Sequence, residues 1–313
     1  MDKRRIDRDP AGPPGAPLPA TRRYLLKGQA IEAPALAGGL HVVATPIGNL
    51  RDITLRALET LAAADLIACE DTRVTRKLID HYGITTPLTP YHEHNAAQAR
   101  PKILARLAGG AAVALVSDAG TPLISDPGFK LAREAGVAGY AVTALPGASA
   151  VLAALAVSGL PTDRFMFEGF LPAREGQRRK RIDEIKGVAA TLVLFETGPR
   201  LAAALADLAA ALGPRAAAIC RELTKLYEEV RRGDLASLAR DYAEIPEPRG
   251  EIVIVVAPPA APAGEAADLD VLLRQALGRT SVKEAVGEIA AVTGRPRREV
   301  YQRALALTQD SEG

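Results

Sequence analysis

Short apolar segments alternate with longer amphipathic ones along most of the chain, starting near Leu40. The segments 41–45 (HVVAT), 113–117 (VALVS) and 191–195 (TLVLF) are short, apolar and rich in β-branched side chains, which is typical of buried strands. Between such segments, 54–64 (TLRALETLAAA) repeats apolar residues at helical spacing. Repeated strand–helix units of this kind predict a layered α/β fold.

The same pattern extends over two halves of the chain. Strands are expected at 41–45, 65–69, 113–117, 140–145, 164–168, 191–195, 216–220 and 251–256. Helices are expected at 54–64, 72–82, 96–107, 130–135, 148–158, 174–186, 200–212 and 235–242. The turn Gly159-Leu160-Pro161 interrupts the alternation near its middle. We therefore expect two α/β domains, at residues 39–159 and 160–258.

The two ends of the chain differ in character from this middle. Residues 1–38 are rich in Pro, Gly and Ala with scattered charge, which predicts a disordered tail. Residues 259–268 are expected to be a Pro/Ala linker. Residues 269–313 are expected to form a small helical module, in which 281–284 (SVKE) is a capping box. Its helix–turn–basic-helix order fits a nucleic-acid-docking unit and a generic helical hairpin equally well.

Composition and charge exclude several classes of protein. The 313 residues carry 39 Lys+Arg and 37 Asp+Glu, a net charge of +2, which excludes a polybasic protein but leaves a local basic groove open. Aromatic residues make up 4% with no Trp, which argues against a sheet that stacks many bases. The 2 Cys favour a cytoplasmic protein with reduced thiols. No apolar stretch reaches the roughly 20 residues that span a bilayer, so no membrane partner is expected.

Three loops at the ends of predicted strands consist of small, turn-forming residues. They are 45–49 (TPIGN), 117–122 (SDAGTP) and 145–149 (LPGAS). In open α/β sheets, ligands bind outside the carboxyl ends of the strands, where Gly and Ala let the main chain approach closely. One such loop is also an ordinary strand-to-helix turn, but three at corresponding positions predict a shared site for a small polar cofactor. None is a phosphate-binding or dinucleotide-binding glycine loop.

Charged side chains follow several of the same strands. They are Glu70, Asp71, Arg73, Glu196, Arg221, Glu222 and Lys225. Basic groups can bind phosphate and carboxylates can accept a proton, although each also has a structural alternative, such as helix capping by Asp71. His92 and His94 are spaced for a metal, but no third ligand follows at a recognisable distance, so no metal site is expected.

Nine motifs follow one another in order from about residue 40 to residue 257. They are 44–54 (ATPIGNLRDIT), 70–73 (EDTR), 91–95 (YHEHN), 115–128 (LVSDAGTPLISDPG), 145–147 (LPG), 158–161 (SGLP), 167–172 (FEGFLP), 221–225 (RELTK) and 249–251 (RGE). Together they resemble the motifs of the ribosomal RNA small-subunit 2′-O-methyltransferases. That family belongs to the tetrapyrrole-methylase-like superfamily of S-adenosylmethionine enzymes.

The resemblance implies two α/β domains of the tetrapyrrole methylase type, with the cofactor in the cleft between them, and a homodimer. It implies methyl transfer from S-adenosylmethionine to the ribose 2′-OH of a cytidine in the decoding centre of 16S rRNA, within the 30S subunit. By position, the residues that would bind the cofactor are Thr45, Pro46, Gly48, Asp118, Ala119, Gly120, Thr121, Pro122, Ser125, Asp126, Gly128, Pro146, Gly147 and Ala148.

Methyl transfer requires that donor and acceptor be held in line, and the ribose hydroxyl gains from a nearby base or electropositive group. We therefore expect Asp71 or Glu70 to act as the base, with Glu222 a further carboxylate of the site. Arg73 and Lys225 are expected to hold the RNA phosphate or to stabilise the developing alkoxide.

Two other functions remain open from the sequence. A tetrapyrrole C-methyltransferase of the cobalamin or sirohaem pathway would share the fold and the cofactor loops, but it needs a wide apolar cavity for its macrocycle. A non-catalytic RNA-binding factor would use the C-terminal helices and bind no S-adenosylmethionine.

Overall fold

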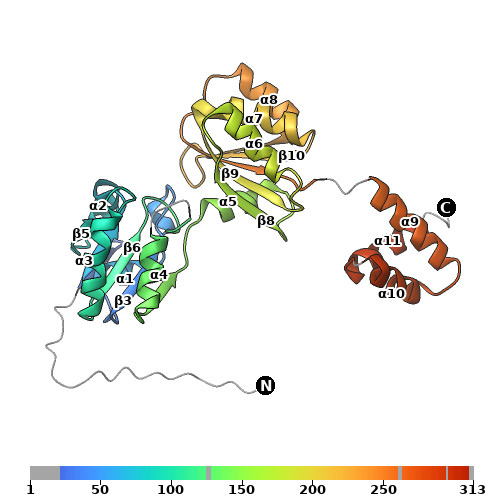
Figure 1. The fold of residues 1–313 in the computed structure, drawn as a ribbon. Coiled ribbons are helices and arrows are strands. Elements are labelled where there is room, and N and C mark those ends of the chain that lie inside the picture. The colour runs from blue at the N-terminus through green and yellow to red at the C-terminus, as the bar shows by residue number, and fades with distance from the viewer. Residues whose placement is uncertain (1–21, 125–127, 260–262, 294, 310–313) are drawn as a thin grey trace.

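The computed structural model describes residues 22–124, 128–259, 263–293 and 295–309. Two α/β domains follow one another along the chain, and a bundle of three helices lies apart from them (Figure 1). No helix in these ranges is long and apolar enough to cross a membrane.

The first domain contains a five-stranded parallel sheet with the strand order β5-β4-β6-β3-β7. Its strands are β3 (Gly39–Val43), β4 (Leu66–Cys69), β5 (Leu88–Pro90), β6 (Ala112–Val116) and β7 (Val142–Leu145). Helices α1 (Leu55–Ala63) and α2 (Thr72–His81) pack on one face, and α3 (Ala96–Ala108) and α4 (Phe129–Val137) on the other. Helices on both faces bury β3, β4 and β6 along their whole length, as in other parallel sheets.

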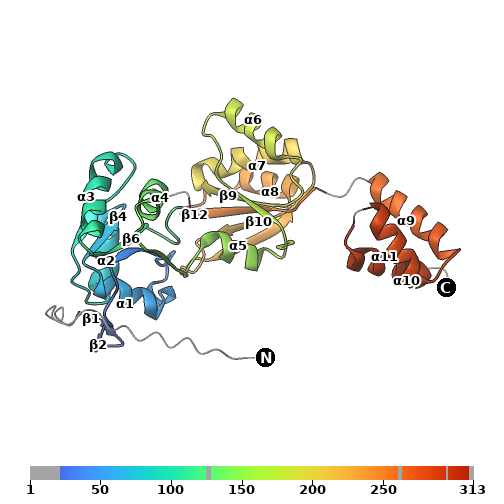
Figure 2. The ribbon, with the colours of Figure 1, turned by 60° about the horizontal axis from the view of Figure 1, so that its bottom comes forward.

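The second domain contains a mixed sheet with the strand order β11-β10-β12-β9-β8, in which only β8 and β9 are parallel. Its strands are β8 (Phe165–Phe170), β9 (Thr191–Thr197), β10 (Ala216–Arg221), β11 (Glu229–Asp234) and β12 (Glu251–Val256). Helices α6 (Glu175–Ile185), α7 (Gly198–Leu212) and α8 (Leu235–Glu244) cover one face. The other face packs against α5 (Ala150–Ser158) and Ile47, so it is turned toward the first domain (Figure 2).

The two-domain α/β fold is confirmed, but the N-terminal prediction is wrong in part. Within the expected disordered tail, β1 (Arg23–Leu26) and β2 (Gln29–Glu32) form an antiparallel hairpin whose turn residues Lys27 and Gly28 have φ of 51° and 79°. Tyr24 is 2% exposed and packs into the core between the sheet and helices α1 and α2. Leu26 and Ile31 pack against the same core, and Leu25 N donates to Tyr82 O at 2.6 Å, so several contacts hold a segment whose composition favours disorder. Residues 1–21 lie outside the described ranges.

The C-terminal module consists of α9 (Ala263–Leu277), α10 (Val282–Thr293) and α11 (Arg297–Gln309). The helices share an apolar core to which Leu273, Ala285 and Val300 contribute. The predicted capping box is confirmed, because Ser281 Oγ donates to Glu284 Oε2 at 2.8 Å and accepts from Glu284 N at 3.4 Å. The linker predicted over 259–268 is wrong at its C-terminal end, since residues 263–268 already belong to α9.

Candidate active site

The three strand-end loops of the first domain are hydrogen-bonded to one another. Thr45 and Gly120 exchange two backbone hydrogen bonds, at 2.9 and 3.0 Å, and Thr45 Oγ1 donates to Ser117 O at 3.2 Å. Thr121 Oγ1 donates to Ala148 O at 3.3 Å. The predicted convergence of these loops is therefore confirmed, and it gathers Thr45–Gly48, Asp118–Pro122 and Pro146–Ala148 at one edge of the sheet.

Two glycines make this close approach possible. Gly120 has a φ of 85°, and a Cβ atom on it would lie 3.2 Å from Ile47 Cγ2. A Cβ atom on Gly147 would lie 2.8 Å from Ala44 Cβ. Larger residues would push the loops apart, which is the reason for glycine at both positions.

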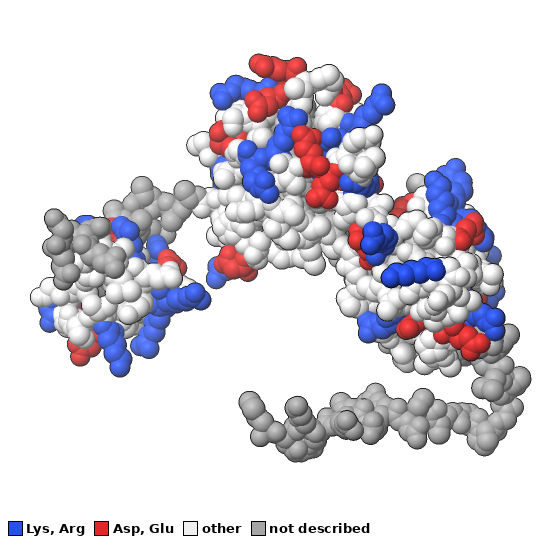
Figure 3. Space-filling view, turned by 180° about the vertical axis from the view of Figure 1, so that it is seen from behind, with Lys and Arg blue, Asp and Glu red and all other residues white. Residues whose placement is uncertain are grey.

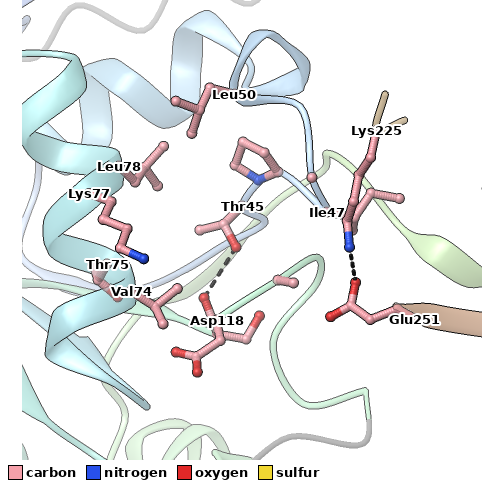
Figure 4. A pocket seen from close by; sticks show the side chains of 14 residues that line it. Thr45, Ile47, Leu50, Val74, Thr75, Lys77, Leu78, Asp118, Lys225 and Glu251 are labelled. Carbon is pink, nitrogen blue, oxygen red and sulfur yellow. Dashed lines mark hydrogen bonds and ion pairs between the residues drawn. The ribbon is translucent and has the colours of Figure 1, made fainter. Parts of the chain in front are cut away.

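One cavity of about 440 Å³ lies between α2 and these loops, and we call it the α2 cavity. Figure 4 shows Lys77 and Asp118 directed into it from one side, with Lys225 and Glu251 of the second domain opposite. Its lining residues are Thr45, Pro46, Ile47, Gly48, Leu50, Val74, Thr75, Lys77, Leu78, Ser117, Asp118, Ala119, Lys225 and Glu251. Both domains therefore contribute charged groups to one space.

A second cavity, of about 240 Å³, lies between the first-domain loops and the sheet of the second domain, and we call it the interdomain cavity. Phe170 and Phe195 form part of its wall, with ring centroids 5.6 Å apart in an edge-to-face arrangement. Its lining residues are Ile47, Ala119, Ile124, Ala150, Phe170, Phe195, Glu196, Thr197, Cys220, Leu223, Gly250, Glu251, Ile252 and Val253. A mostly apolar cavity with aromatic walls, next to loops rich in backbone polar groups, fits a planar heterocycle with a polar tail.

A third hollow, of about 470 Å³, lies on the far side of Asp118. It is lined by Glu70, Asp71, Thr72, Arg73, Pro90, His92, His94 and Asp118. The rings of His92 and His94 have centroids 6.1 Å apart. Within the ranges that the structure describes, no group of three His, Cys, Asp or Glu side chains is arranged to hold a metal ion.

Asp71 is held in a structural arrangement at the start of α2. Its carboxylate accepts from Arg73 N at 2.8 Å and pairs with the Arg73 guanidinium at 2.6 Å. The hydrogen bonds from the Arg73 side chain and backbone lower the pKa of Asp71 to about 2. An acid this strong is a poor proton acceptor near neutral pH, so the geometry does not favour Asp71 as the base.

Asp118 combines access to the α2 cavity with a weaker acid. It lies two residues after the end of β6, and its Oδ1 accepts from Asp71 N at 3.0 Å. Burial raises the pKa of Asp118, and the charge of Asp71 acts in the same direction. A raised pKa brings this carboxylate closer to the range in which a general base works.

Lys225 extends from the second domain to the first. Its Nζ pairs with Glu222 Oε1 at 2.7 Å and with Glu251 Oε2 at 2.8 Å. Burial would lower the pKa of Lys225, but the hydrogen bonds that its Nζ donates to Glu222 and Glu251 outweigh burial and raise the pKa, so the amine stays charged. Glu222 and Thr224, neither of them glycine, have φ of 50° and 67°. Such strained backbone is concentrated at functional sites.

The remaining predicted residues lie in different environments. The Arg73 side chain is 88% exposed, whereas Pro122 and Gly128 are buried. Glu70 borders the third hollow, and Ser125 and Asp126 lie outside the described residues.

Three residues that line the cavities were not predicted from the sequence: Lys77 in the α2 cavity, and Phe195 and Leu223 in the interdomain cavity. Lys77 lies one helical turn after Arg73, a spacing that places both on one side of α2.

Comparison with known proteins defines the class to which this site belongs. Residues 39–239 match the family of Tetrapyrrole (Corrin/Porphyrin) Methylases, and residues 263–308 match the RsmI C-terminal HTH domain. The fold resembles that of a diphthine synthase, with a TM-score of 0.55 and 19% identity over 70% of this chain and 89% of that one. It also resembles the methyltransferase CobJ, with a TM-score of 0.51 and 20% identity over 71% and 94% of the two chains.

Relatives at higher identity define the family more narrowly. The chain is 54% identical to ribosomal RNA small subunit methyltransferase I of Mesorhizobium japonicum, over 90% of this chain and 96% of that one. It is 46% identical to the protein of the same name from Pseudomonas aeruginosa, over 86% and 97%. The chain therefore belongs to the ribosomal RNA small subunit methyltransferase I family of enzymes.

Proposed function

We propose that the protein transfers a methyl group from S-adenosylmethionine to the ribose 2′-OH of a cytidine in the decoding centre of 16S rRNA, with the 30S subunit as substrate. The observation that carries this proposal is the adjacency of the two cavities, which share Ile47, Ala119 and Glu251. The interdomain cavity suits an apolar ring, and the α2 cavity presents charged groups. Donor and acceptor bound in adjacent cavities would meet at their common wall.

The interdomain cavity and the adjoining loops would hold the cofactor. Phe170, Phe195 and Leu223 would contact its adenine ring, and the backbone groups of the loops at Thr45, Asp118 and Pro146 would bind its polar part. S-adenosylmethionine, when bound, supplies an electrophilic methyl group on a sulfonium. The protein need only position that group and exclude water from it.

The α2 cavity would receive the target nucleotide. Asp118, rather than Asp71 or Glu70, would accept the proton that the ribose hydroxyl loses as its oxygen bonds to the methyl carbon. Lys77 and Lys225 would bind the flanking phosphates and stabilise negative charge on the oxygen. Glu222 would hold the Lys225 amine in place through their 2.7 Å ion pair.

The tetrapyrrole alternative fits this cavity less well. A macrocycle needs a broad apolar surface, whereas Lys77, Asp118, Lys225 and Glu251 all line the α2 cavity. The names of the relatives also favour ribosomal RNA over a tetrapyrrole as the substrate. A non-catalytic RNA-binding factor would have no use for two matched cavities at the strand ends.

We further propose a homodimer in which exposed apolar side chains of α4, β7 and α5 contribute to the interface. Phe129 and Val137 of α4 are 63% and 85% exposed, Val142 of β7 is 42% exposed and Leu152 of α5 is 57% exposed. Exposed apolar side chains are typical of protein interfaces where they gather into a patch. Light scattering should give twice the chain mass for the wild type and the chain mass for a Phe129→Glu/Val137→Glu variant. A monomeric wild type would contradict this assembly.

Labelled methyl transfer tests the activity. Purified protein and labelled S-adenosylmethionine are mixed with 30S subunits, free 16S rRNA or uroporphyrinogen, and labelled nucleosides are identified after nuclease digestion. We expect 2′-O-methylcytidine from 30S subunits and no label in the porphyrinoid. Label on a base, or in the porphyrinoid, would refute the proposal. Calorimetry that detects no S-adenosylmethionine binding would favour the non-catalytic alternative.

A further inference from the structure

The C-terminal module presents a helix surface that the proposed catalytic site does not use. Buried positions Val300, Ala304 and Leu307 of α11 face the core of the module. The opposite side of the helix carries Arg298, Tyr301, Gln302 and Leu305, all exposed, with Arg297 at its edge. We call these five residues the α11 face. Tyr301 is 47% exposed and Leu305 is 39% exposed, so an aromatic and an aliphatic side chain lie beside the two arginines at the surface.

The positive charge of the α11 face comes from Arg297 and Arg298, and none of its five residues is acidic. Among described residues of the module, Asp270 pairs with Arg303 and Glu288 pairs with Arg279. Glu299, the acid of α11, pairs with Arg295 at 2.8 Å. Glu284 is held in its capping box by Ser281. Basic side chains project from the module in Figure 3. The surface therefore complements a polyanion.

We propose that the α11 face binds ribosomal RNA and docks the enzyme on the 30S subunit, an inference that rests on the proposed substrate. Arginine binds phosphates and guanine edges, glutamine binds base edges, and tyrosine stacks on unpaired bases. An α-helix does not enter the deep, narrow major groove of regular A-form RNA. The contact therefore falls on a loop, a bulge or a widened groove rather than on a regular duplex.

The connection between the C-terminal module and the methylase domains allows the α11 face and the catalytic site to contact the same 30S subunit. Six residues separate the end of β12 at Val256 from the start of α9 at Ala263. A chain of that length spans at most about 25 Å. The α11 face therefore reaches RNA close to the target nucleotide and positions the enzyme without touching the reacting atoms.

The test uses the full chain with an Arg298→Glu/Tyr301→Ala variant. Arg240→Glu, an exposed arginine on α8, is the matched charge-reversal control. We expect 30S binding, measured by filter binding, to weaken about tenfold or more in the variant, with a shallower dependence on salt. The KM for 30S subunits should rise by a similar factor with kcat within about twofold. S-adenosylmethionine binding and circular dichroism should match the wild type.

A conservative Arg298→Lys/Tyr301→Phe variant should retain most 30S binding, which separates a lost contact from a lost fold. Unchanged 30S affinity in the Glu/Ala variant would overturn the inference, as would an equal loss in Arg240→Glu. A change of oligomeric state with intact RNA binding would identify the face as a protein contact and would also overturn it. If the wild type transferred no methyl group to RNA, the proposed function would fail, while the binding measurement would still report on this face.

Discussion

The side chain of Lys225 crosses the backbone of Gly48, so a Cβ atom on Gly48 would lie 2.4 Å from Lys225 Cγ. Gly48 belongs to the first strand-end loop and Lys225 to the second domain. This contact joins the two halves of the α2 cavity, and it depends on the absence of a side chain at one residue.

Gly48→Ala should therefore displace Lys225 and lower kcat/KM for 30S methylation by about tenfold or more, a transition-state loss of roughly 1.4 kcal/mol. Because Gly48 is exposed, the melting temperature should change little. Gly176→Ala in α6 is the control, since a Cβ there meets nothing within 4 Å. Full activity of Gly48→Ala would show that the position of Lys225 is not critical.

Replacing Lys225 itself tests the charge. Lys225→Met keeps much of the chain length but leaves Glu222 and Glu251 without their shared cation. We expect kcat to fall about a hundredfold, within the range for loss of one electrostatic stabiliser. Arg23→Met, which removes an exposed ion pair in the β1–β2 hairpin, should leave turnover unchanged. Equal turnover of Lys225→Met and wild type would exclude Lys225 from the chemistry.

The pH dependence of turnover distinguishes the candidate bases. A base works in its ionised form, so activity falls as the pH drops through its pKa. If Asp118 is the base, the acid limb of kcat/KM lies above the ordinary aspartate range, because burial raises the pKa of Asp118. Asp118→Asn should then lose most activity. An active Asp118→Asn variant alongside an inactive Asp71→Asn would reverse the assignment.

The aromatic wall of the interdomain cavity provides a separate test of cofactor binding. Phe195→Ala should weaken S-adenosylmethionine binding about tenfold in calorimetry, because a stacking surface is lost. Phe165→Ala, at the start of the neighbouring strand β8 and outside the cavity, is the control for loss of an aromatic ring from the same sheet. Equal affinities for the two variants would place the cofactor elsewhere.

A buried ion pair predicts how stability depends on pH. Burial would raise the pKa of Asp207, but hydrogen bonds from Arg179 and Arg178 outweigh burial and lower it. The stabilisation is therefore present above the unfolded-state pKa and is lost as the pH falls through the folded-state value. Asp207→Asn should cost about 3–5 kcal/mol at pH 7.

Chemical denaturation of Asp207→Asn and wild type at pH 7 and pH 3 measures this effect. The difference in unfolding free energy should shrink toward acid, because only the wild type loses the pair on protonation. Asp183→Asn, which removes an exposed pair with Lys186, should change stability little at either pH. A constant difference across pH would contradict the assignment.

Much of this architecture is predictable from the sequence because buried strands and their loops have local signals. Segments such as 191–195 are short, apolar and β-branched, and the small residues of 117–122 mark a close approach of backbones. The edge strands β5 and β11 were not predicted from the sequence. The sequence of β11, EVRRGD, is charged because an edge strand keeps one side in solvent.

The site itself is less predictable, because its second wall comes from distant residues. Nothing in the sequence near Phe195 or Leu223 indicates that they meet Ile47 across a domain boundary. Asp71 and Asp118 look equally able to act as a base in sequence. Only the neighbouring Arg73 guanidinium and the degree of burial separate their acidities.

The short connection between β12 and α9 has a kinetic consequence. Once either part of the enzyme touches the ribosomal subunit, the other part is held near it at an effective concentration of roughly millimolar. Two individually weak contacts can then give tight overall binding while each contact still dissociates and rebinds rapidly. The methylase domains can thus release a modified nucleotide while α11 keeps the enzyme bound to the 30S subunit. The enzyme leaves the subunit only when both contacts are broken at the same time.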